Sequence, residues 1–140
     1  MKTILLTTII FLGFATYGQK DDQKAIKSVI IAFSKAGDAQ DTKVLSDVLD
    51  ESYRIVMNQL FGSKEVNVMS RDVFLEKIKT KEFGGDERDV SIGQIILNGN
   101  TATAHVSFKG IKMTFTSLIV LVKNAEGKWK MVSETPVIGA

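Results

Sequence analysis

The chain has 140 residues, no cysteine, one histidine, and 18 basic against 16 acidic side chains. The absence of cysteine excludes disulfides, thiolate metal ligands, a cysteine nucleophile and a lipid-modified cysteine anchor. The charges are nearly balanced and dispersed, so the clustered basic stripe of a nucleic-acid-binding domain is missing, and we expect no nucleic-acid partner.

Residues 1–18 have the pattern of a secretory signal peptide. Lys2 precedes an apolar run that extends through Phe14, and small residues follow. The run is too short for a comfortable membrane span, and no later stretch approaches the roughly 20 apolar residues that a span requires. We therefore expect a secreted or periplasmic protein that begins near Gln19, forms one domain over residues 19–140 and has no membrane partner after cleavage.

Three amphipathic helices and a pair of strands are predicted in the first half of the domain. The helices open at Asp21, Asp41 and Ser70, and each carries its apolar residues along one side. Between the second and third helices, residues 53–57 are predicted as a strand, with a short return strand around residues 66–68.

The last third of the chain, residues 88–135, predicts four consecutive antiparallel strands. Asn98-Gly99-Asn100 indicates a two-residue hairpin, and turns at Gly110 and Gly127 separate the remaining strands. Helices segregated on one face of an antiparallel sheet define an α+β domain.

Regular alternation along these strands predicts an inner face whose side chains are large and apolar at both ends of the face and small in its middle. The small residues are Gly93, Ala104, Ser117 and Ser133. They leave room for a ligand beneath the helices, unless large helix side chains fill the space as ordinary core. The predicted ligand-binding residues are Tyr53, Met57, Ala104, Phe115, Ser117, Trp129 and Ser133. The aromatic and methionine residues among them are also typical of a plain core.

The order of elements resembles the nuclear-transport-factor-2-like superfamily. The resemblance rests on Asp41, Leu45, Leu49 and Tyr53 at four-residue spacing and on the closing Gly127-Lys-Trp-Lys-Met. Within the superfamily, four stretches of the chain resemble the putative lumazine-binding (SnoaL-like) group: residues 70–78, 98–104, 115–118 and 127–133. The resemblance implies a cone-shaped curved antiparallel sheet with three helices packed on its concave face. Members of the superfamily include cyclases, isomerases, dehydratases and non-catalytic association domains, so the fold alone selects no function.

Proton-transfer catalysis on this fold needs a carboxylate or histidine inside the cone. Residues 53–58, where the resemblance places an acid, contain neither. His105 falls on the outer face by alternation, and so does Glu134, which enters the pocket only if the turn register shifts by one residue. We expect no catalytic residue and no cofactor. We also expect no metal, because one histidine without cysteines leaves only carboxylates as ligands.

The outer face of the predicted sheet is unusually apolar. It carries Ile92, Ile96, Leu118, Val120, Val122 and Val132. Such a patch favours a homodimer formed through the sheet, unless the C-terminal tail or a bend of the sheet covers it.

The function that we expect is non-enzymatic binding of a small apolar or aromatic molecule by an exported, dimeric domain. One alternative is a cofactor-free isomerase, cyclase or dehydratase that uses Glu134, Tyr53 or His105, and another is a purely structural association module. A cavity with an ionisable group favours the enzyme, a neutral cavity favours the binding protein, and a filled core favours the module.

Overall fold

The computed structural model describes residues 14–139. Most of the predicted signal peptide therefore lies outside the described residues. The helices are α1 (Phe14–Ala39), α2 (Thr42–Val48) and α3 (Arg71–Lys79). The strands are β1 (Leu49–Asn58), β2 (Val66–Ser70), β3 (Asp89–Asn98), β4 (Thr101–Lys109), β5 (Thr114–Lys123) and β6 (Trp129–Ile138). No helix among residues 14–139 is long and apolar enough to cross a membrane.

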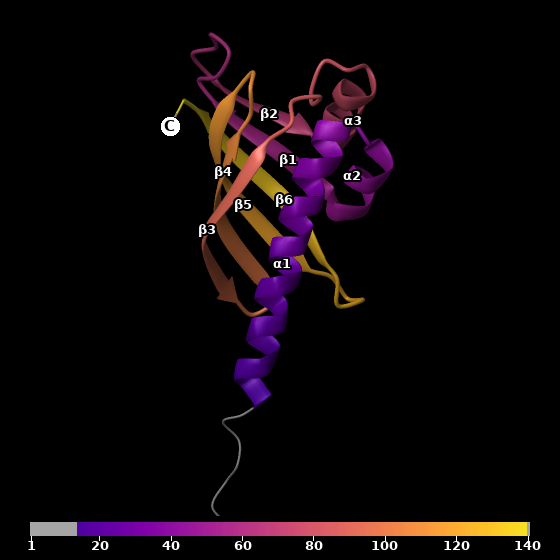
Figure 1. The fold of residues 1–140 in the computed structure, drawn as a ribbon, viewed down its shortest axis with the longest axis vertical. Coiled ribbons are helices and arrows are strands. Elements are labelled where there is room, and N and C mark those ends of the chain that lie inside the picture. Colours follow the sequence, from indigo (N-terminus) through magenta and orange to yellow (C-terminus); the bar gives the residue numbers. More distant parts are fainter. Residues whose placement is uncertain (1–13, 140) are drawn as a thin grey trace, which may run out of the picture.

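The six strands form one curled sheet in the order β2-β1-β6-β5-β4-β3. All neighbouring strands are antiparallel except β1 and β6, which are parallel. The three helices lie on the same side of the sheet, with α1 running lengthwise across it and α2 and α3 beside its upper half (Figure 1). The predicted α+β cone with three helices on one face is confirmed, and the one parallel pair makes the sheet mixed.

The predicted helix starts at Asp41 and Ser70 are N-caps in the structure. The Asp41 carboxylate accepts hydrogen bonds from the backbone N–H groups of Lys43 and Val44. The Ser70 hydroxyl accepts one from Val73. These contacts satisfy N–H groups that the first turn of a helix leaves free, which is why these residue types mark the two starts.

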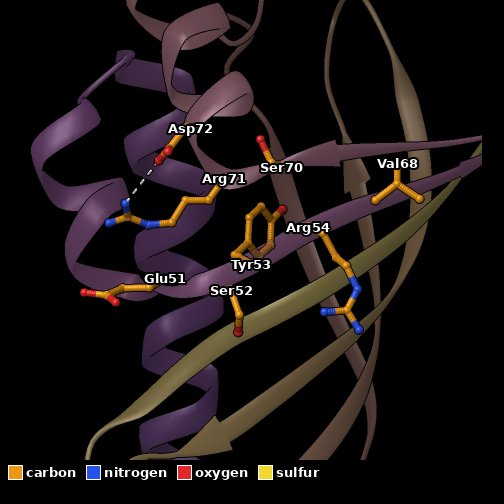
Figure 2. Close-up of a pocket in the computed structure, with 8 residues that line it drawn as sticks. All are labelled: Glu51, Ser52, Tyr53, Arg54, Val68, Ser70, Arg71 and Asp72. Atoms are coloured by element: carbon orange, nitrogen blue, oxygen red, sulfur yellow. Dashed lines mark ion pairs between the residues drawn. The ribbon is translucent and has the colours of Figure 1, made fainter.

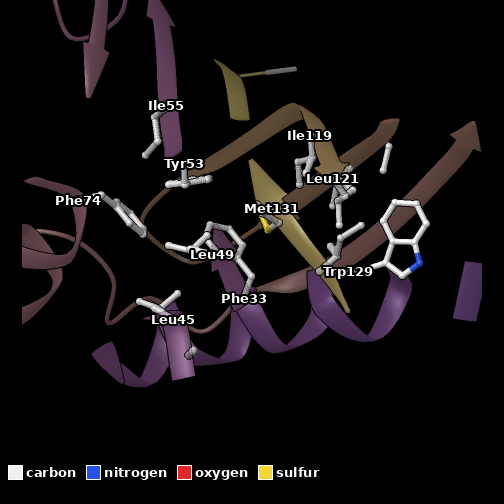
Figure 3. Packing of buried hydrophobic residues seen from close by; sticks show 14 of the residues in the cluster. Phe33, Leu45, Leu49, Tyr53, Ile55, Phe74, Ile119, Leu121, Trp129 and Met131 are labelled. Carbon is white, nitrogen blue, oxygen red and sulfur yellow. The ribbon is translucent and has the colours of Figure 1, made fainter. Parts of the chain in front are cut away.

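A single hydrophobic core lies between the helices and the sheet (Figure 3). Its upper part is aromatic: the ring of Phe33 on α1 lies 6.4 Å from that of Tyr53, 6.1 Å from Phe74 and 6.3 Å from Phe108, measured between ring centroids. Such separations are typical of attractive aromatic pairs. Tyr53, which the sequence predicts as a ligand-binding residue, is 1% exposed and packs within this core.

The alternation predicted for β4 is confirmed. The two-residue loop after Asn98 places Leu97 opposite Ala102 and Ile95 opposite Ala104, and both alanines are buried. His105 lies on the exposed outer face, opposite Leu118.

A bulge in β3 reverses the predicted faces of its first half. Ile92 pairs with Val106 and Ile95 with Ala104, so Gly93 and Gln94 together oppose the single residue His105. One extra residue exchanges inward and outward positions on one side of the bulge. The prediction that Ile92 lies on the outer face is therefore wrong, because its side chain packs against the core.

A second bulge, at Val132 in β6, has the larger consequence. Met131 pairs with Leu121 and Ser133 with Val120, which leaves Val132 as the extra residue. Beyond it, Glu134 pairs with Ile119 on the inner face and is 4% exposed. The predictions that Glu134 points outward and that Ser133 faces the pocket are both wrong, because alternation restarts one residue later.

Candidate functional site

A cavity of about 410 Å³ lies at the upper end of the sheet. Its wall is largely apolar, with Phe33, Ile55, Met57, Phe74, Phe83 and Phe115 among the lining residues. Its mouth is formed by the β1–β2 loop, the α3–β3 loop, the β4–β5 hairpin and the end of β6. These segments lie together at the upper end of the molecule in Figure 1. Volume and composition are those of a small-molecule site.

Glu134 is the buried acid of this cavity. The hydroxyl of Tyr53 donates a hydrogen bond of 2.9 Å to Oε2 of Glu134, and the hydroxyl of Ser117 donates one of 2.6 Å to Oε1. The three residues come from β1, β6 and β5, which are neighbours in the sheet. The Val132 bulge turns Glu134 inward at the level where both donors reach it.

Burial raises the pKa of the Glu134 carboxyl above its ordinary value of 4.5. The hydrogen bonds from Ser117 and Tyr53 and the charge of Arg88 oppose this shift without cancelling it. Burial and the neighbouring carboxylate also raise the pKa of Tyr53 well above 10.0, so the tyrosine keeps its proton and remains a donor. A carboxyl in such surroundings can exchange a proton with a bound molecule, and it can also form a hydrogen bond from either protonation state.

Arg88 forms the cationic part of the wall. Its Nε lies 2.5 Å from Oδ1 of Asp38, and its Nη2 donates a 2.9 Å hydrogen bond to the carbonyl of Ser34. Its guanidinium carbon lies 5.2 Å from the ring centroid of Phe108 and 5.8 Å from that of Phe115. These contacts tie the start of β3 to the end of α1, and the pairing with Asp38 neutralises the charge locally.

The structure brings four of the seven predicted site residues together. Met57 and Phe115 line the cavity, while Tyr53 and Ser117 hold its acid.

The other three predicted residues lie elsewhere. Ala104 belongs to the buried core cluster and not to the cavity wall. Trp129 is fixed by a 2.9 Å hydrogen bond from its indole N–H to Asp22 on α1. Ser133 is turned away by the bulge. Of the small residues predicted in the middle of the inner face, Ala104 lies in the packed core, and the cavity lies nearer the upper end of the sheet.

The sequence reasoning missed Arg88 and the aromatic wall residues Phe33, Phe74 and Phe83. It placed Glu134 in the pocket only if the turn register shifted by one residue; the turn keeps the predicted register, with Leu121 opposite Met131, and the bulge at Val132 turns Glu134 inward instead. Gly93 was a usable signal for the first bulge, because an isolated glycine within a strand often marks one. Nothing local in the sequence marks the second bulge at Val132.

A second, more polar groove of about 320 Å³ lies over β1 and the start of α3 (Figure 2). Its charged side chains have mixed signs: Glu51, Arg54, Arg71 and Asp72. Arg71 is already engaged, since Nη1 lies 3.8 Å from Asp72 and Nη2 donates to the carbonyl of Ser46. The groove has no apolar wall comparable to that of the cavity, so we take the cavity around Glu134 as the candidate site. Within residues 14–139, no three side chains of the histidine, aspartate or glutamate type are grouped to hold a metal ion.

The fold and the cavity define the class: this is a domain with the nuclear-transport-factor-2-like fold, in which a curled sheet and helices enclose a small-molecule-sized cavity. The family model described as "Putative lumazine-binding" matches residues 21–135, and the chain belongs to that family. A search of curated proteins finds no match.

Solved structures of the same fold share little sequence with this chain. A nuclear-transport-factor-2-like protein of unknown function from Silicibacter pomeroyi DSS-3 superposes with a TM-score of 0.75 at 19% identity, over 86% of this chain and 98% of the other. A similar protein of unknown function from Shewanella baltica gives 0.74 at 20% identity, over 86% and 95%. A ketosteroid isomerase-like protein from Erwinia carotovora atroseptica gives 0.65 at 14% identity, over 84% and 95%. At these identities the similarity establishes the fold alone.

Proposed function

We propose that the protein binds a small apolar or aromatic molecule in the cavity, and that Glu134 is the polar anchor of the bound molecule. The observation that carries this proposal is a buried carboxyl, held by two hydroxyl donors, in a cavity whose wall is largely apolar and aromatic. A ligand pocket usually has a small number of polar groups among apolar side chains, and these polar groups fix the orientation of the ligand.

Three features support a flat ligand with a hydrogen-bonding edge. Phe74 and Phe115 contribute aromatic side chains to the cavity wall, and Met57 contributes a polarisable, adaptable one. Glu134 accepts or donates a hydrogen bond according to its protonation state. The description of the family, putative lumazine-binding, agrees with a flat heteroaromatic molecule of this kind.

A second function is favoured by one specific observation, the raised pKa of Glu134 inside a cavity. A carboxyl with such a pKa suits a general acid or base in a cofactor-free proton transfer. Both oxygens of Glu134 already accept a hydrogen bond from the protein, so the side chain is positioned as an anchor whether or not it also moves a proton.

Titration with lumazine and with an apolar naphthalene dye tests the binding proposal. The wild type should bind at least one of them, and Met57→Trp, which places a bulkier side chain in the cavity wall, should reduce that affinity about tenfold or more. Ser133→Ala is the matched control, because Ser133 directly precedes Glu134 on β6 but lies off the cavity wall. This variant should bind as the wild type does. Equal affinities in all three proteins would place any binding outside the cavity.

Proton exchange at carbon tests the second function. If Glu134 is a base, the wild type should accelerate deuterium incorporation next to the carbonyl of small cyclic ketones, and Glu134→Gln should abolish the acceleration. Binding without exchange would leave the protein as a binding domain.

We also propose that the protein is exported and that it forms a homodimer through the outer face of the sheet. Export is supported by the pattern of residues 1–18. The dimer is supported by the outer-face side chains of Ile96, Leu118 and Val137, which are 54%, 59% and 56% exposed. Burying apolar area of this kind drives association.

A further inference from the structure

Arg88 has one side-chain nitrogen that the fold leaves without a partner. Its backbone N–H donates to Oδ2 of Asp38, its Nε to Oδ1 of the same carboxylate and its Nη2 to the carbonyl of Ser34. Within residues 14–139, no oxygen accepts a hydrogen bond from Nη1. The only buried side-chain nitrogen without a partner in this part of the chain is Nε of Arg71, so Nη1 of Arg88 is not sealed inside the protein. Arg88 therefore keeps an accessible donor although its side chain is only 12% exposed.

This donor belongs to a residue of the cavity wall. Arg88 lines the cavity together with Phe115 and Glu134. The guanidinium carbon lies 5.8 Å from the ring centroid of Phe115, and the charge of Arg88 acts on the Glu134 carboxyl. The contacts with Asp38 and Ser34 fix the plane of the guanidinium, so the direction of the Nη1 donors is set before a ligand binds.

The charges around the cavity favour a neutral partner for this donor. The lining residues include three basic and three acidic side chains: Lys81, Arg88, Lys112, Glu82, Asp86 and Glu134. Arg88 is already paired, since its Nε lies 2.5 Å from Oδ1 of Asp38. A carboxylate on the ligand would share the cavity with the Glu134 carboxyl, and two neighbouring carboxylates oppose each other's ionisation. A carbonyl oxygen accepts a hydrogen bond from an N–H donor without adding a charge.

We propose that the ligand is a neutral carbonyl compound, whose carbonyl oxygen accepts a hydrogen bond from Nη1 of Arg88 while its apolar part lies along the aromatic wall. This inference rests on the proposed binding function and adds the chemical class of the ligand. Arg88 and Glu134 then hold different atoms of one molecule, so its orientation in the cavity is fixed at two points. A ligand of the same shape without the oxygen would leave the guanidinium nitrogen desolvated and unpaired, so the site should discriminate against it.

Two naphthalenes of nearly the same shape test the donor. 2-Acetylnaphthalene carries a carbonyl group, and in 2-isopropylnaphthalene a methyl group takes the place of the carbonyl oxygen. The hydrocarbon is the more apolar of the two, so a purely apolar cavity would bind it more tightly. We expect the wild type to bind 2-acetylnaphthalene about tenfold more tightly. Equal or tighter binding of 2-isopropylnaphthalene would overturn this inference and leave the binding proposal standing, whereas binding of neither compound would overturn both.

Two variants assign the preference to one side chain. Arg88→Lys keeps a positive charge near Asp38 but removes Nη1, so the tenfold preference should disappear. Lys112→Met, which removes another cation that lines the cavity, is the control and should keep the preference of the wild type. An unchanged preference in Arg88→Lys, or an equal loss in both variants, would overturn the proposal.

Arg88→Lys also loses contacts that tie β3 to α1, so a second measurement uses the wild-type protein. ¹⁵N NMR follows the guanidinium nitrogens of Arg88, with Arg54→Lys and Arg71→Lys to assign the signals of the other arginines, which line the separate polar groove. Saturating 2-acetylnaphthalene should shift the Arg88 signals, and saturating 2-isopropylnaphthalene should shift them much less. Equal shifts with the two compounds would contradict a hydrogen bond between Arg88 and the carbonyl.

Discussion

The hydroxyl of Tyr53 donates a 2.9 Å hydrogen bond to Oε2 of Glu134, although the two residues are 81 positions apart. The contact joins β1 to β6 next to the parallel pairing of Ile55 with Glu134. It fixes the inward rotamer of the only carboxyl that is buried among the described residues. Its effects on stability and on protonation can be measured separately.

Glu134→Gln should change how stability depends on pH. The folded-state pKa of Glu134 is raised above 4.5, so folding favours the protonated form. Its contribution is fully present below the unfolded-state pKa and is lost as pH rises through the folded-state pKa. The melting temperature of the wild type should therefore fall relative to that of Glu134→Gln as the pH rises above 4.5. The pKa values of Asp22, Asp50 and Asp86 are lowered from 3.8, so the titration of these carboxyls in the folded state does not overlap the pH range in which Glu134 titrates. Parallel melting curves would contradict the assignment.

Tyr53→Phe should destabilise the protein and raise the pKa of Glu134 further, because the tyrosine donor favours the ionised carboxyl. Loss of a buried hydrogen bond to a charged group costs about 1.5–3 kcal/mol. Chemical denaturation of Tyr53→Phe, Glu134→Gln and the double variant gives the coupling between the two side chains. Additive losses would mean that the 2.9 Å contact contributes nothing.

Ala104→Phe should destabilise the protein without acting on the cavity. Ala104 is 1% exposed within the packed core, and overpacking such a site costs about 1–3 kcal/mol or more. Ala125→Phe, in the exposed β5–β6 turn, is the control and should melt close to the wild type. If Ala104→Phe instead keeps its melting temperature and loses ligand affinity, a second void lies in the middle of the sheet.

Leu118→Glu should convert the proposed dimer to monomer while leaving the fold intact, since it places a charge in the apolar outer face. Sedimentation velocity measures the mass, and circular dichroism checks the fold. Ile111→Glu, at the cavity mouth, should leave the dimer unchanged. A wild type that already sediments as a monomer at micromolar concentration would end the dimer proposal.

Much of the fold could be predicted from the sequence because its signals are local. Asp41 and Ser70 mark helix starts by their capping chemistry, and the two-residue Gly99-Asn100 turn sets the register of β3 and β4 at Leu97 and Ala102. Gly99 has a φ of 60°, the left-handed value that explains glycine there.

The site could not be predicted in the same way because its geometry depends on contacts that are distant in sequence. The Val132 bulge decides whether Glu134 faces the core, yet its partners on either side belong to β1 and β5. The end of β6 shows the same limit. Pro136 lies just beyond the strand region predicted over residues 88–135, yet it continues the ladder opposite Ser117. It can do so because β1 pairs with β6 only as far as Glu134 and needs no N–H from the proline.

The most direct test of the central claim is the titration of the Glu134 carboxyl carbon by ¹³C NMR, with Glu134→Gln to assign the signal. The claim is that Glu134 lies in the cavity as a protonatable anchor for a small ligand. We predict a midpoint above 4.5 that moves when lumazine or the naphthalene dye binds. A midpoint at or below 4.5 that does not respond to a bound ligand would show that Glu134 is neither buried in the cavity nor in contact with what the protein binds.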